Sequence, residues 1–216
     1  MKTTLPLAAL AGLALTASAT AAVIITPTSA TSTTTIGGSR TIDYTIDGSD
    51  LTAAGDPGTI VDDTHAVNDD SAGYWLSGAD AVSGSEVLTF DLGGTFDVTD
   101  IHHWRYTRAG GAPTRSLKTF DIYVSTNGGS SYSLGVAAAT LGDFALPPYT
   151  ALPAVTKTFA TQSGVTHIEL RNLVNHGDAS FYGLSEIRFG GEVVPEPTTT
   201  ALLGLGGLAL ILRRRK

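Results

Sequence analysis

The sequence predicts an all-β fold, an antiparallel β-sandwich, from three observations. Short runs in the middle of the chain alternate apolar and polar residues, as half-buried strands do. Gly- and Asp-rich segments separate these runs, and the Asn127-Gly128 pair favours a hairpin turn. No stretch in the middle of the chain sustains the apolar spacing of an amphipathic helix. Roughly seven or eight short strands arranged in this way are typical of a sandwich.

The expected strands follow one another along the chain. They lie in residues 41–47 (TIDYTID), 86–94 (EVLTFDLGG), 96–106 (FDVTDIHHWRY), 118–132 (the hairpin KTFDIYVSTNGGSSY), 154–161, 165–173 and 184–191. Trp104 is centred in one of them and is expected to belong to the core. The connection between Asp47 and Tyr74 is long, and loops of that length usually have a function.

The first 21 residues predict a secretory signal peptide. Met1-Lys2 gives a positively charged start, residues 5–15 are apolar, and small residues follow at a typical cleavage position. The apolar run is too short and too weakly apolar for a permanent anchor. Residues 22–40, which are rich in Thr, are either a leader or a first strand, and residues 41–191 are expected to be the exported domain.

The C-terminal residues predict a membrane-associated sorting segment. Residues 192–197 form a linker that contains Pro195-Glu196-Pro197, and residues 198–212 are mostly apolar. The basic stop of residues 213–216 includes Arg213, Arg214 and Arg215, and such a stop is expected on the cytoplasmic side. The apolar run is shorter than the roughly 20 residues of a full span. Three glycines within it would weaken a soluble core helix.

This order of tripeptide, apolar segment and basic end resembles the PEP-CTERM sorting signal of bacteria that make exopolysaccharide. The resemblance implies a partner, the membrane-embedded protease exosortase, which processes such proteins near the Pro-Glu-Pro tripeptide. It also implies export through the inner membrane, a membrane-anchored precursor, and a mature protein at the cell surface or outside the cell.

The composition narrows the range of functions. The chain has no cysteine, so no disulfide stabilises the exported domain. The net charge is −7, and Lys2 with the four cations of the tail accounts for five of the 13 basic residues. The body therefore has eight basic residues against 20 acidic ones. Such an acidic body argues against nucleic acid as a partner, because binding phosphates needs cations.

The middle of the chain resembles the F5/8 type C domain, also called the discoidin or galactose-binding-like jelly roll. The resemblance rests on residues 87–107, residues 114–133 with the hairpin FDIYVSTNGG, and residues 166–189 ending in GLSEIRF. It covers most of the exported domain, from about residue 42 to residue 189. One departure is the long connection between Asp47 and Trp75, which remodels the loop that carries ligands in the family.

The resemblance implies a structural Ca²⁺ ion held by Asp47, Asp50 and Glu186. Such an ion takes carboxylate and carbonyl oxygens and would join the early Asp-Gly loop to the last strand. The alternative is a local turn at Asp47 and an ordinary ion pair for Glu186.

A glycan is the second ligand that the resemblance implies. Sugars are held by an aromatic ring and by planar hydrogen-bonding groups, and the loops after residues 104 and 172 supply both and are expected at one end of the sandwich. The candidate contacts are Arg105, Tyr106, Arg108, Arg115, Asn175, His176 and Tyr182.

The sequence predicts no enzyme. It has no Gly-x-Ser-x-Gly motif, and His102 and His103 are adjacent on a strand and so face opposite sides. We therefore expect a non-catalytic surface or matrix protein that adheres to extracellular polysaccharide. The alternatives are a structural matrix protein that contacts other proteins without binding sugar, and a divergent hydrolase.

Overall fold

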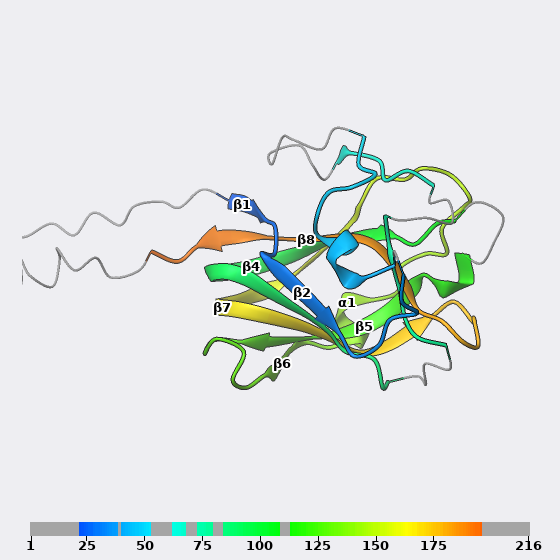
Figure 1. The fold of residues 1–216 in the computed structure, drawn as a ribbon. Coiled ribbons are helices and arrows are strands. Elements are labelled where there is room, and N and C mark those ends of the chain that lie inside the picture. The colour runs from blue at the N-terminus through cyan, green and yellow to red at the C-terminus, as the bar shows by residue number, and fades with distance from the viewer. Residues whose placement is uncertain are drawn as a thin grey trace, which may run out of the picture.

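The computed structural model is an all-β antiparallel sandwich, as the sequence predicted (Figure 1). It describes residues 22–38, 40–52, 62–67, 73–79, 84–108 and 113–195. The expected signal peptide (1–21), the apolar segment (198–212) and the basic stop (213–216) lie outside the described residues. Within the described residues, no helix is long and apolar enough to cross a membrane.

Six strands lie side by side in the sheet, each hydrogen-bonded to the next, and every pairing between named strands is antiparallel. Their order is β1 (Ala22–Ile25), β8 (Gly183–Val193), β4 (Leu88–Arg105), β7 (Val155–Asn175), β5 (Leu117–Ser125) and β6 (Ser133–Val136). The short strands β2 (Ser29–Ser32) and β3 (Trp75–Leu76) pair with β4 and β8 respectively. The Thr-rich segment therefore contributes strands to the sheet.

Strands β4 and β7 are longer than the sequence suggested. Residues 86–94 and 96–106 were expected to be two strands, but they join in β4, and β7 likewise joins residues 154–161 and 165–173. The pairing of β4 with β7 changes register between Asp91 and Phe96, where Gly93 has a φ of 72°. The pair Gly93-Gly94 therefore produces an irregularity within a continuous strand, and the expectation of two separate strands was wrong.

Residues 41–47 were also expected to form a strand, but Ile42–Thr45 is a 3-10 helix, η1. Ile42 and Thr45 are both buried, which matches the three-residue repeat of this helix. The Thr45 hydroxyl donates a hydrogen bond to the Ile42 carbonyl at 2.7 Å, which closes the turn. The alternation of Ile42, Tyr44 and Ile46 with polar residues fits a strand equally well. The spacing of apolar residues alone therefore could not distinguish a strand from a 3-10 helix.

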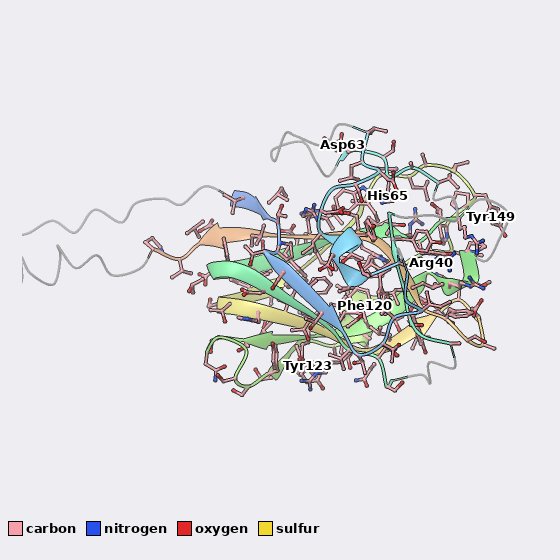
Figure 2. All side chains as sticks on the ribbon, viewed as in Figure 1. Arg40, Asp63, His65, Phe120, Tyr123 and Tyr149 are labelled. Carbon is pink, nitrogen blue, oxygen red and sulfur yellow. The ribbon has the colours of Figure 1, made fainter. Side chains whose placement is uncertain are left out.

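The main core lies between the strands, with Phe120 in the interior (Figure 2). Phe90 of β4 and Phe189 of β8 meet edge to face, with ring centres 5.8 Å apart. Trp104 is fully buried, as expected, but it packs against Leu51 in a smaller cluster.

The connection after Asp47 covers this smaller cluster. The indole N–H of Trp104 donates to the Asp63 carbonyl at 2.8 Å. His65 pairs through its backbone with both Leu51 and Leu152. Trp104 of β4 and Glu186 of β8 are partners across the two strands. The described parts of the long connection therefore cover the face of the sheet on which these two residues lie.

Candidate ligand-binding site

Three connections meet where β4 ends and β5 begins, on the right in Figure 1. The His176 N–H donates to the Thr114 carbonyl at 2.8 Å, which ties the β7–β8 connection to the β4–β5 connection. Arg105, the last residue of β4, donates from its guanidinium to the Ala145 carbonyl at 3.1 Å. The two loops predicted to carry the site therefore lie together, and residues 143–145 of the β6–β7 connection lie beside them.

Arg115 is held in a fixed orientation at this end. Its Nε atom lies 3.0 Å from a carboxylate oxygen of Asp178, and its guanidinium lies 4.5 Å from the ring centre of Phe181. Burial alone would raise the pKa of Asp178, but the N–H groups of Ser180 and Phe181 and the Arg115 guanidinium together hold it below its ordinary value. Asp178 is therefore an ionised anchor for Arg115.

Asn175 shapes the loop that carries Asp178. Its side-chain amide donates to the carbonyls of Asp178 and Phe181, both at 2.8 Å. Its side-chain oxygen accepts a hydrogen bond from the N–H of Gly177, also at 2.8 Å. Both the nitrogen and the oxygen of the Asn175 side-chain amide therefore form hydrogen bonds within the loop, although this residue was predicted to contact a ligand.

The two predicted tyrosine contacts are buried. Tyr106 has 0% exposed surface and meets Tyr74 edge to face with ring centres 5.1 Å apart. Burial raises the pKa of Tyr106 to about 12. Tyr182 belongs to the main core. Neither ring offers a face to a ligand, so this part of the prediction is corrected: an aromatic residue next to a loop was taken for an exposed one.

The predicted residues Arg105 and His176 lie in a second group, around residues 143–145. Burial lowers the pKa of Arg105. Burial, and then the positive charge of Lys118, lower the pKa of His176. Arg108, also predicted, is partly exposed and lies next to residues 109–112, which are outside the described residues.

The sequence reasoning missed the most exposed aromatic residue of this end. Tyr149 is 58% exposed, and Leu146 nearby is 50% exposed. Figure 2 shows Tyr149 at the outer edge of the domain. The signal was the Pro-rich stretch ALPPYTALP (residues 145–153), which lacks strand alternation and contains an aromatic residue between turn-forming ones. Phe181, also missed, supplies the partly buried ring beneath Arg115.

The predicted calcium ligands Asp47, Asp50 and Glu186 do not form a group of metal-binding side chains in the described part of the chain. Glu186 is buried, pairs with Arg188, and accepts a hydrogen bond from the Gly48 N–H at 3.2 Å. Asp47 acts electrostatically on both Glu186 and His65, and Asp50 acts on His65. Among the described residues, no three His, Asp or Glu side chains form a group that could hold a metal ion.

Two oxygen atoms near the Asp47 loop are nevertheless buried without a hydrogen-bond partner. They are Oε2 of Glu186 and the hydroxyl oxygen of Ser49. Burial, against the opposing charge of Arg188, raises the pKa of Glu186 to about 8. The Asp47 carboxylate accepts a hydrogen bond from the Ser49 N–H at 2.8 Å, which is the local turn considered as the alternative. Both the turn and the ion pair are thus present beside unsatisfied oxygen atoms.

The comparisons with known proteins agree with the two resemblances. Residues 193–216 match the family model of the PEP-CTERM protein-sorting motif. This motif implies export and exosortase-mediated sorting to the cell surface. No curated protein sequence matches the chain.

Similar solved structures include carbohydrate-binding modules of family 32. One is the module of NanJ from Clostridium perfringens in complex with galactose (18% identity, 79% of this chain and 99% of that chain, TM-score 0.52). Another holds two such modules of ZmpB from the same organism in complex with GalNAc (16% identity, 77% and 35%, TM-score 0.53). A third is truncated AlyQ, with such a module and an alginate lyase domain (13% identity, 84% and 36%, TM-score 0.50). The chain therefore carries a PEP-CTERM protein-sorting motif at its C-terminus and a domain with the fold of family 32 carbohydrate-binding modules, the F5/8 type C fold.

Proposed function

We propose that this protein is a non-catalytic adhesin of the cell surface or extracellular matrix. It binds polysaccharide through the loop end of its sandwich, the end where the β4–β5, β6–β7 and β7–β8 connections meet. The observation that carries the proposal is the fixed guanidinium of Arg115, held by Asp178 and Phe181 on the side where three connections meet. Planar donors with a fixed orientation suit sugar hydroxyl groups, because little entropy is lost when they bind.

The exposed ring of Tyr149 adds the second element of sugar recognition. An aromatic face packs on the C–H groups of a sugar ring, and such rings are effective when they are exposed and held by a short loop. The galactose and GalNAc present with the NanJ and ZmpB modules support a sugar as the ligand class. A single shallow site binds weakly, and many copies on one surface would strengthen adhesion through avidity.

The route to the surface belongs to the same proposal. The exported precursor would be held in the inner membrane by residues 198–212 and processed by exosortase near Pro195, Glu196 and Pro197. The mature domain would then remain at the cell surface or in the extracellular polysaccharide.

A structural Ca²⁺ ion is proposed beside Glu186. The buried, unsatisfied Glu186 Oε2 and Ser49 hydroxyl, with Asp47 close by, are oxygen donors of the kind that calcium prefers. When bound, the ion would neutralise the ionised carboxylate of Glu186 and fix the loop that contains Gly48. The Arg188 guanidinium already supplies one positive charge there, so the ion would join an existing pair.

A glycan array followed by calorimetry tests the binding function. We expect the purified protein to bind one or a few glycans, and Arg115→Ala to weaken that binding by about tenfold or more, the loss of one or more charged hydrogen bonds. Arg171→Ala is the matched control, because Arg171 stacks on Tyr123 and pairs with Glu169 on the outer face of the sheet. Absence of binding to every glycan would refute the adhesin and leave the structural matrix protein as the better reading.

A further inference from the structure

Four basic side chains surround residues 143–145, and we call them the basic cluster: Arg105, Lys118, Lys157 and His176. Arg105 donates to the Ala145 carbonyl at 3.1 Å. Lys157 donates to the Asp143 carbonyl at 2.8 Å and lies 4.9 Å from the ring centre of Phe144. Lys118 lies 3.2 Å from the Asp143 carboxylate. The side chains come from three strands and one loop and converge on one short segment.

The positive charge of the basic cluster is poorly compensated. Asp143 supplies the one carboxylate contact found for these four side chains within the described part of the chain. Arg105, through Nη1, and Lys157 donate to backbone carbonyls, which carry no net charge. Two nitrogen atoms, Nε of Arg105 and Nε2 of His176, are buried and have no hydrogen-bond partner.

The positive charges of the basic cluster act on His176 and on His103, which lies beneath the cluster. Besides burial, the charges of Lys118 and Arg105 lower the pKa of His176. Beneath it, burial and the nearby positive charges lower the pKa of His103 to about 3. An anion placed beside these groups would relieve the repulsion.

The basic cluster contrasts with the rest of the domain and is open to solvent. The exported body has 20 acidic residues and eight basic ones, so uncompensated cations at one place set the local field apart from that of the whole surface. Lys118 is 41% exposed and Asp143 is 60% exposed at the side-chain level. The exposed Leu146 and Tyr149 follow directly on the same loop.

We propose that the basic cluster binds the negatively charged groups of an acidic polysaccharide, with Tyr149 packing against a neighbouring sugar ring. This inference rests on the proposed function, because it names the chemical class of the glycan bound at the loop end. A carboxylate or a sulfate ester has the charge and the acceptor oxygens that Arg105, Lys118 and His176 can use. An uncharged glycan would leave the repulsion of the cluster unrelieved.

Calorimetry with matched ligands tests the inference on the full-length protein in mild detergent. The first pair is a galacturonic acid oligomer and the same oligomer with its carboxylates reduced to alcohols, and the second pair is dextran sulfate and dextran. We expect the charged member of at least one pair to bind about tenfold tighter than its neutral form at low salt, and the difference to shrink at high salt. The pair that responds identifies carboxylate or sulfate.

Equal binding of charged and neutral forms would overturn the acidic ligand and leave the proposed adhesin intact. Absence of binding by every member, on these oligomers and on a glycan array, would overturn both. The two failures are therefore distinguishable in a single series of titrations.

Charge variants add a test in both directions. Lys118→Gln should weaken binding of the charged oligomer about fivefold, and Asp143→Asn should strengthen it by a similar factor, typical of one partly exposed charge. Both positions are exposed enough for folding to tolerate the change. Arg171→Gln, with the same loss of charge away from the cluster, should change affinity little. Opposite or absent shifts at Lys118 and Asp143 would overturn the assignment.

The pH dependence supplies a readout that a structural role would not produce. Lys118, Arg105, His103, the Asp143 carboxylate and the Phe144 backbone surround His176. Because a bound anion favours the imidazolium form, affinity for the charged oligomer should rise as the pH falls from 7.5 to 5.5. His176→Gln should remove this rise, and the neutral oligomer should not show it. A rise that persists in His176→Gln would contradict the role of this residue.

Discussion

The Glu186 carboxyl group and the Arg188 guanidinium contact each other on one face of β8, and both side chains are almost completely buried. Residues two apart on a strand face the same side, and the connection after Thr45 covers this pair. The Arg188 guanidinium also donates to the Ile187 carbonyl at 2.7 Å and to the Thr45 carbonyl at 3.4 Å, while Gly48 donates to Glu186. The pair therefore fastens the early loop to the last strand.

The first prediction concerns the pH dependence of stability at Glu186. Burial raises its pKa to about 8 from an ordinary value of 4.5, so between these two pH values the folded protein holds one more proton than the unfolded chain. The free energy of unfolding should therefore fall as the pH rises through this window, by an amount on the order of a few kcal/mol. Urea unfolding in EDTA at pH 5, 6, 7 and 8 measures it.

Calcium and a variant provide the controls. Calcium requires the ionised carboxylate, so added calcium should raise the melting temperature most at pH 8 and least at pH 5. Glu186→Gln should abolish both the calcium effect and this part of the pH slope, although it lowers stability by removing the partner of Arg188. A calcium effect that survives in Glu186→Gln would contradict the proposed ion site.

The second prediction concerns acid stability at His103. The ring is fully buried between Phe120 and Phe144, and burial lowers its pKa to about 3. Below pH 6.5 the unfolded chain takes up a proton that the folded protein excludes, so this group should reduce the free energy of unfolding as the pH falls from 6.5 toward 3. His103→Leu should flatten the acid side of the stability profile, by an amount on the order of a few kcal/mol near pH 3.

His102→Leu serves as a comparison on the opposite face of β4, where His102 contacts Asp100 at 2.7 Å and Thr156 at 2.8 Å. The hydrogen bond from this histidine lowers the pKa of Asp100, so His102→Leu should act on the stability profile below pH 3.8, the ordinary pKa of that carboxyl. An acid limb identical in wild type and His103→Leu would show that His103 does not set it.

Periodicity predicted the interior well because alternation reports burial directly. Phe90, Ile101, Phe120, Ile168 and Phe189 all lie in the core, as their places in alternating runs indicated. The lengths of the strands could not be read in the same way. A Gly-Gly pair ends a strand or distorts it, and whether β4 continues depends on its partners β7 and β8, which are distant in sequence.

The site was harder to predict because exposure depends on what covers a residue. Tyr106 and Tyr149 both stand in loops rich in polar or turn-forming residues. Tyr106 is covered by Tyr74, which follows a connection that the sequence could not place, whereas Tyr149 is left in solvent. The charges of Arg105 and His176 were visible in the sequence, but their convergence on Ala145 and Phe144 required the fold.

The third prediction separates these two tyrosines. Tyr149→Ala should weaken glycan binding by about tenfold, the value of one stacked ring, and leave the melting temperature nearly unchanged. Tyr106→Ala should instead destabilise the domain by about 3–5 kcal/mol, because it opens a cavity beside Tyr74 and Gly183. Gly183 is adapted to this ring, since a Cβ atom there would lie 2.6 Å from Cγ of Tyr106. Thermal unfolding and calorimetry on the same samples measure both effects.

Tyr149→Phe is the control for the ring itself. Stacking needs the aromatic face and not the hydroxyl, so this variant should retain most of the affinity. Loss of binding in Tyr149→Phe as large as in Tyr149→Ala would point to a hydrogen bond from the hydroxyl and away from stacking. Unchanged binding in both variants would remove Tyr149 from the site.

The fourth prediction concerns the sorting motif in the producing bacterium. Replacing Pro195, Glu196 and Pro197 with alanine should leave an uncleaved precursor in the membrane fraction. Exosortase would no longer recognise the tripeptide, and the apolar residues 198–212 would still anchor the protein in the membrane. The matched control replaces Thr198, Thr199 and Thr200, which directly follow the motif and should leave processing intact. Mass spectrometry of the C-terminus distinguishes cleaved from uncleaved protein, and fractionation locates it. Normal cleavage and release of the alanine variant would refute a role for this tripeptide in processing. Loss of cleavage in both variants would show that exosortase recognises more of the segment than the tripeptide.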